Sequence, residues 1–81
     1  MDDATVLSRI SELVDEEHRL RSQAQSGQIS TDDERARLRQ LEEALDQCWD
    51  LLRRRRAARA AGGDPDSAQA QPIPEVEGYL Q

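Results

Sequence analysis

LRQLEEALDQCWDLL, residues 38–52, decides the fold of this chain. Apolar residues recur in it at alternating spacings of three and four, at Leu38, Leu41, Leu45, Cys48 and Leu52. This heptad pattern places them on one face of a helix and is typical of helices that pack as a coiled coil. The stretch therefore predicts a long amphipathic helix that needs an apolar partner.

An earlier stretch has the matching pattern. Its apolar stripe consists of Val6, Ile10, Leu13, Leu20 and Ala24, with Glu17 where an apolar residue is due. If the chain reverses at residues 27–29, residues whose numbers add to about 58 face each other, so Leu13 meets Leu45 and Val6 meets Leu52. The two stripes coincide in this register, which predicts an all-α antiparallel two-helix hairpin.

Local signals give the boundaries of the hairpin. Asp2 or Asp3 can cap a first helix over about residues 3–26, and Gly27 suits its end. Ser30 or Thr31 can cap a second helix over about residues 32–60, which Gly62-Gly63-Asp64-Pro65 stops. We therefore expect a hairpin domain over residues 1–61 and a flexible tail over residues 62–81 that contains all three prolines.

Two further predictions concern the seam, which is the line of contact between the two apolar stripes. Leu13, Leu41, Leu45 and Leu52 should be among the most buried side chains. Glu17 falls opposite Leu41, and its carboxylate should reach out to Arg37 or Gln40. A polar residue in a seam can also select a register or a partner.

Composition limits what such a hairpin can do alone. The 81 residues include no Phe, one Trp, one Tyr and one Cys, and 35% are charged. Burial and ordering entropy nearly balance in chains of this size, and one Cys cannot form an internal disulfide. Self-association is the remaining common source of stability.

A second apolar surface also favours self-association. Leu7 and Val14 flank the seam on the first helix and lie on the same side as Trp49, whereas Ala44 and Leu51 lie on the opposite side. Exposure of a Trp side chain to water is energetically unfavourable, so we expect another protein surface to pack over these apolar edges. We predict that Leu7, Val14 and Trp49 form the interface of a homodimer, a four-helix bundle. The alternative cover is the tail.

Charge is uneven along the chain, whose net charge is −6. All eleven basic residues are Arg, and five lie close together, at Arg53, Arg54, Arg55, Arg56 and Arg59. This cluster can stabilise a helix C-terminus and lies beside Asp2 and Asp3 in the hairpin register. It could also contact an acidic protein partner or nucleic acid. Overall acidity, an acidic tail and the lack of interleaved aromatics favour structure or a protein partner.

The sequence shows no residues that carry chemistry. Asp15 and His18 have the spacing of a bundle metal motif, but both point away from the seam. Cys48 lies in the apolar seam, where a thiol has a raised pKa and is inert. No phosphate-binding loop or catalytic dyad is present. We expect no enzymatic activity, no cofactor and no metal.

The tail ends in a possible linear motif. Ile73, Val76, Tyr79 and Leu80 return apolar character after an Ala/Gln-rich stretch, and the last three have i, i+3, i+4 spacing. Residues 64–72 should act as a tether, with the motif contacting a partner. An inert terminus is the alternative.

Several stretches resemble a family of small uncharacterised actinobacterial proteins. The resemblance rests on residues 10–14, 16–18, 45–53 and 75–81, and it covers nearly the whole chain. It implies no activity and no site.

The N-terminus is acidic and no run of residues approaches the length of a membrane span, so we expect neither a signal peptide nor membrane insertion. A single free Cys suits a reducing cytoplasm. The sequence therefore predicts a small cytoplasmic helical module for protein–protein interaction, and the alternative is a nucleic-acid-associated regulator that uses the Arg cluster.

Overall fold

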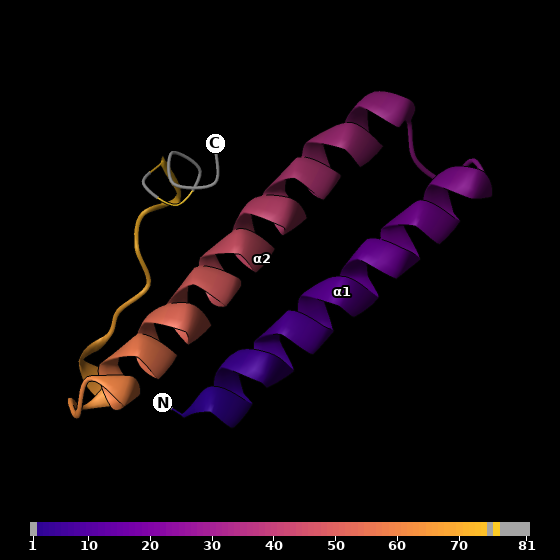
Figure 1. The fold of residues 1–81 in the computed structure, drawn as a ribbon. Coiled ribbons are helices and arrows are strands. Elements are labelled where there is room, and N and C mark those ends of the chain that lie inside the picture. The colour runs from indigo at the N-terminus through magenta and orange to yellow at the C-terminus, as the bar shows by residue number, and fades with distance from the viewer. Residues whose placement is uncertain (1, 75, 77–81) are drawn as a thin grey trace.

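A computed structural model of the chain describes residues 2–74 and 76. The described residues form α1 (Asp3–Gln25), α2 (Thr31–Ala60) and a short 3-10 helix, η1 (Pro65–Ser67), with no strand. Figure 1 shows α1 and α2 side by side and antiparallel, with the N-terminus beside the C-terminal end of α2. The all-α hairpin is confirmed, and its helices end within one residue of the predicted bounds.

Side-chain caps start both helices. Asp2 is the N-cap of α1, and its Oδ1 accepts a hydrogen bond from the Thr5 amide at 2.8 Å. Ser30 is the N-cap of α2, and its Oγ accepts from the Asp33 amide at 3.1 Å. Each bond satisfies an amide that has no partner within its helix, so the caps fix where the helices begin.

Glycine ends both helices in the same way. Gly27 and Gly62 have φ values of +77° and +79°, the left-handed region that glycine enters without steric cost. After α1, the amide of Gln28 donates to the carbonyl of Gln23 at 2.9 Å. After α2, the amide of Gly63 donates to the carbonyl of Ala58 at 2.8 Å. These Schellman motifs stop the helices and turn the chain sharply.

The tightest packing lies at the end of the hairpin where the N-terminus meets the C-terminal end of α2. Val6, Ile10, Leu51 and Leu52 form a buried cluster, which we call the core cluster. The residues that pack against it are Val14, Leu45, Cys48 and Ala68. The cluster joins the two stripes in the predicted register, and Ala68 adds a contribution from the tail.

Packing is looser toward the loop. Leu13 and Leu52 are each 2% exposed, as predicted, and Leu20 is also buried. Leu41 and Leu45 are only half-buried, against expectation. Leu41 lines an open groove between the helices together with Leu13 and Leu20, which are buried.

Glu17 does not reach across the seam. Its carboxylate pairs with Arg21 on the same helix, with 3.7 Å between Oε1 and Nε, and not with Arg37 or Gln40 as expected. The i, i+4 spacing lets the side chain leave the seam without crossing to α2.

The described part of the tail returns along α2 (Figure 1). Gln47 Nε2 donates to the carbonyl of Gln71 at 2.9 Å, and Arg54 donates to the carbonyl of Gln69. Val76 is 1% exposed. The residues that we expected to act as a tether therefore contact the helix in this structure.

Candidate interaction surface

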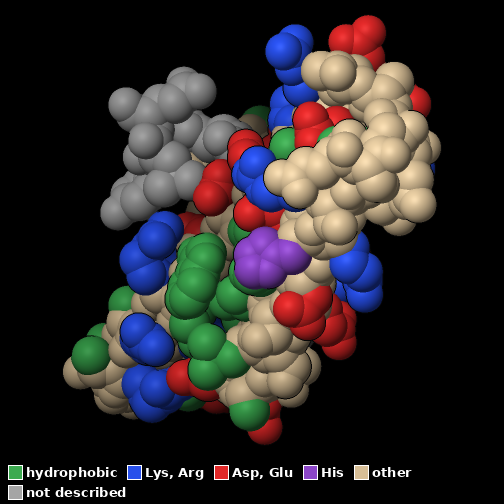
Figure 2. Space-filling model, turned by 90° about the vertical axis from the view of Figure 1, so that its right-hand side faces the viewer, with side chains coloured by type: hydrophobic (Ala, Val, Ile, Leu, Met, Phe, Trp, Pro, Cys, Tyr) green, Lys and Arg blue, Asp and Glu red, His purple; other side chains and the backbone are tan. Residues whose placement is uncertain are grey.

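Trp49 and Leu7 form an exposed apolar surface on one side of the hairpin. They are 46% and 43% exposed, and no other large hydrophobic side chain among residues 2–74 and 76 is exposed to this extent. Val14 is half-buried and packs against the core cluster. All three occupy position e of the heptad, counted with Ile10 and Leu45 at position a, and the e positions of antiparallel helices adjoin. We call Leu7, Val14 and Trp49 the Trp49 surface. Figure 2 shows hydrophobic side chains gathered on one face.

The tail covers the opposite side. Its contacts with α2 are made by Gln47 and Arg54, both at position c, and Ala68 packs on the cluster that contains Leu51. Of the two predicted apolar edges, the described tail therefore covers the one with Leu51. It does not cover the Trp49 surface, which remains in contact with solvent.

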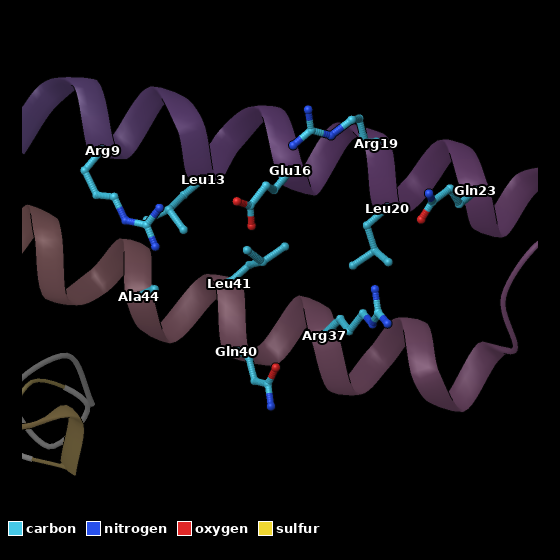
Figure 3. Close-up of a pocket in the computed structure, with 10 residues that line it drawn as sticks. All are labelled: Arg9, Leu13, Glu16, Arg19, Leu20, Gln23, Arg37, Gln40, Leu41 and Ala44. Atoms are coloured by element: carbon cyan, nitrogen blue, oxygen red, sulfur yellow. The ribbon is translucent and has the colours of Figure 1, made fainter.

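The interhelical groove lies on the tail side, nearer the loop. It encloses about 690 Å³. Figure 3 shows Leu13, Leu20 and Leu41 between the helices, and Arg9 and Arg37 leaning toward the groove from opposite helices. The groove is open and its polar rim is mixed in charge, so it has no feature that selects a ligand.

Arg55 occupies a seam position although it is charged. The residue is 4% exposed, and Nε donates to Oδ1 of Asp3 at 2.8 Å. Nη1 donates to Oδ1 of Asp66 at 2.9 Å and to the carbonyl of Pro65 at 3.3 Å. The guanidinium therefore joins α1, α2 and the tail. Asp3 and Arg55 also obey the predicted register, one turn beyond Val6 and Leu52.

Asp3 binds a second guanidinium. Its Oδ2 accepts from Nη2 of Arg59 at 2.6 Å. The hydrogen bonds from Arg55 and then Arg59 lower the pKa of the Asp3 carboxyl below its usual 3.8. The bond to Asp3 and then the bond to Asp66 raise the pKa of Arg55. Asp3 and Arg55 are thus held in their charged forms.

The other members of the Arg cluster lie differently. Arg53 Nη2 is 3.4 Å from Oδ1 of Asp50, and Arg54 bonds to the tail backbone. Arg56 is exposed. The five arginines predicted as one contact surface therefore divide between an internal network, held by Arg55 and Arg59, and the surface of α2.

Asp50 is buried at 6% exposure. Its Oδ2 has no hydrogen-bond partner among the residues that the structure describes. Burial of a carboxylate oxygen without a hydrogen bond is energetically costly.

Cys48 is half-buried against the core cluster, and burial raises the pKa of its thiol. His18 is exposed. Within the described part of the chain, no group of three or more His, Cys, Asp or Glu side chains is placed to hold a metal ion. The absence of an enzymatic site or cofactor stays a prediction.

The predicted tail motif is only partly described. Ile73 is half-buried and Val76 is buried. Tyr79 and Leu80, together with the acids Glu75 and Glu77, lie outside the described residues. The contact of this motif with a partner stays a prediction.

Sequence reasoning missed the link between Arg55 and Asp66. The heptad pattern marks Arg55 as a charge at a core position, which could have signalled a buried ion pair with Asp3. No periodicity relates Asp66 to α2, because it lies beyond the glycine stop. The groove was missed for a similar reason, since it depends on how far the helices stand apart.

A family model with the description "Protein of unknown function (DUF2630)" matches residues 2–81. Uncharacterised proteins of Mycobacterium bovis and of two strains of Mycobacterium tuberculosis are 52% identical to the chain over 77 residues. Each alignment covers 95% of this chain and 88% of the relative. No solved structure matches the chain. The similarity spans the hairpin and the tail and confirms the resemblance to small actinobacterial proteins.

Within residues 2–74 and 76, no helix combines the length and the apolar character needed to cross a membrane.

Proposed function

Since this chain belongs to the DUF2630 family of proteins of unknown function, we propose a role from its surface: a non-enzymatic module that binds protein through the Trp49 surface. The observation that carries this proposal is the exposure of Trp49, at 46%, beside Leu7 on the side that the described tail leaves uncovered. Trp is enriched among the residues that dominate binding energy at protein interfaces. A small chain that exposes its single Trp gives up burial that it needs for stability, and a partner would restore that burial.

The charge distribution supports protein over nucleic acid. Arg55 and Arg59, two of the five clustered arginines, are engaged with Asp3. The net charge of −6 also opposes association with a phosphate backbone. We place the module in the cytoplasm, because its one cysteine is a free thiol.

Affinity capture from the source cell tests the proposal. Tagged wild-type chain should recover a protein partner, which includes untagged copies of itself, and Trp49→Glu should lose it. Trp49→Phe is the matched control, because it keeps an apolar ring at the same position, and it should retain the partner. Circular dichroism should show equal helix content for all three chains. Equal recovery by wild type and Trp49→Glu would contradict the proposal, and retention on DNA at low salt would favour a nucleic-acid role instead.

A further inference from the structure

The charges that flank Trp49 on α2 form a symmetrical series. Glu42 and Asp46 precede Trp49 by seven and three residues, and Arg53 and Arg56 follow it by four and seven. These spacings keep all five side chains on one face of the helix. Glu42, Trp49, Arg53 and Arg56 are exposed and Asp46 is half-buried. In Figure 2, acidic side chains interspersed with Arg lie above the hydrophobic cluster, and further Arg side chains lie along its left side. Between residues 42 and 56 the face therefore runs from acidic through apolar to basic, and Arg35 and Arg39, both exposed, continue it on the loop side of Glu42.

Such a series is complementary to itself when one copy is reversed. If two α2 helices pack antiparallel with Trp49 on a two-fold axis, each residue faces the residue equally far from Trp49 on the other side. Glu42 then faces Arg56 of the second copy, each about 10 Å from the axis. Asp46 then faces the position that directly precedes Arg53 in the second copy. The symmetry repeats every contact, as in any interface that uses the same surface twice.

The opposite orientation is disfavoured by the same charges. In a parallel pair aligned on Trp49, Glu42 would face Glu42 and Arg56 would face Arg56. Like charges brought together across an interface suppress the wrong arrangement. The charge order therefore selects the antiparallel pair.

We propose that the partner bound by the Trp49 surface is a second copy of this chain, packed antiparallel through α2 with Trp49 at the two-fold axis and Glu42 paired to Arg56. The inference rests on the proposed function, because it names the partner of the same surface. Leu7 and Val14 border Trp49 from α1 and extend the apolar centre of the interface. The hydrogen bonds of the described tail are made by Gln47 and Arg54, which lie on the other side of α2 from Trp49. Arg53 contacts Asp50 on its own helix.

A charge exchange between two variants tests the register. Glu42→Arg places two Arg–Arg contacts in the dimer, and Arg56→Glu places two Glu–Glu contacts in it. Each full-length variant alone should therefore have a dimer dissociation constant about tenfold or more above that of wild type.

The two variants mixed in equal amounts should form a heterodimer. The arginine introduced by Glu42→Arg would face the glutamate introduced by Arg56→Glu, and the unchanged Arg56 and Glu42 would pair at the other end of the interface. Analytical ultracentrifugation measures this association against the 9.2 kDa monomer mass.

Matched controls carry the same charge changes elsewhere. Asp15→Arg and Arg19→Glu alter exposed residues of α1 outside the proposed face and should leave the dissociation constant of the dimer unchanged. Circular dichroism on every variant checks that the helices remain.

The outcomes separate this inference from the proposed function. A wild-type chain that stays monomeric at all concentrations, while Trp49→Glu still loses a captured partner in cells, overturns the second-copy inference and leaves the interaction surface standing. A wild-type dimer whose two charge variants fail to combine overturns the antiparallel register. Restored association in the mixture alone, with both controls unchanged, supports the inference.

Discussion

Arg55 is the residue whose structural role differs most from what its type suggests. A charge at a seam position is costly to bury unless its donors are satisfied, and here Nε and Nη1 reach two carboxylates and a carbonyl. The sequence predicted that the Arg cluster would lie beside Asp3, because both follow from the hairpin register. It did not predict which arginine would be buried, since that depends on where the tail places Asp66.

The ion pair of Asp3 makes stability depend on pH. Because the pKa of Asp3 is lowered in the folded chain, its ionised form stabilises the fold above the usual value of 3.8. This contribution is lost as pH falls below 3.8 and through the lowered pKa. Asp3→Asn should therefore unfold at lower urea than wild type at pH 7, and the difference between the two chains should be smaller at pH 3.

Asp15→Asn is the control for this measurement, because Asp15 is exposed on the outer face of α1. Its urea midpoint should match wild type at both pH values. A constant gap between wild type and Asp3→Asn from pH 7 to pH 3 would show that the carboxylate charge of Asp3 does not matter.

At the scale of helices, the heptad spacing was sufficient to predict the hairpin. The spacing of apolar residues set the register, and Ser30, Gly27 and Gly62 set the ends. The heptad spacing could not predict whether the side chains of the seam are equally buried along its length. Two matching stripes assign the same role to Leu41 and Leu52, yet one is half-buried and the other is 2% exposed. The difference depends on how closely the facing helix packs on each side chain, since Leu13 and Leu20 line the same groove as Leu41 and are buried.

Alanine substitutions should report that difference. Leu13→Ala removes a side chain that is 2% exposed and should cost ~2–5 kcal/mol, a large part of the stability of so small a chain. Leu41→Ala should cost less than about 2 kcal/mol, because water already reaches part of the side chain and the site can relax. Thermal unfolding followed by circular dichroism gives both values. Equal losses would mean that the loop half of the seam is packed as tightly as the rest.

At the scale of the whole molecule, the two sides of the hairpin are not equivalent. The sequence identified both apolar edges and offered the tail or a second copy as covers. The sequence could not predict which edge the tail covers. The tail is held partly through the backbone carbonyls of Gln69 and Gln71, and because every residue has a backbone carbonyl, such contacts leave no pattern in the sequence. The structure assigns the described tail to the edge with Leu51.

Two truncations separate the parts of the tail. A chain that ends at residue 63 loses Asp66 and Ala68, so the buried Arg55 loses a partner and the core cluster loses a contact. It should melt at a lower temperature than a chain that ends at residue 72, which keeps both. The longer chain should also keep its helix content while losing any partner that the terminal motif binds. Identical melting curves for the two truncations would mean that η1 and Ala68 add nothing to the fold.

The gradient of packing along the hairpin has a consequence for how the molecule opens. The core cluster and the Arg55 network lie at the end where both termini of the hairpin meet, whereas toward the loop Leu20 is buried but Leu38 and Leu41 on α2 are only half-buried. Local unfolding starts where the fewest apolar contacts must be lost. Amide hydrogens near the loop therefore exchange with deuterium sooner than those around Leu52. In a pair of helices joined by a short turn, fraying ordinarily begins at the free ends. Here the core cluster and the ion pair between Asp3 and Arg55 hold those ends together.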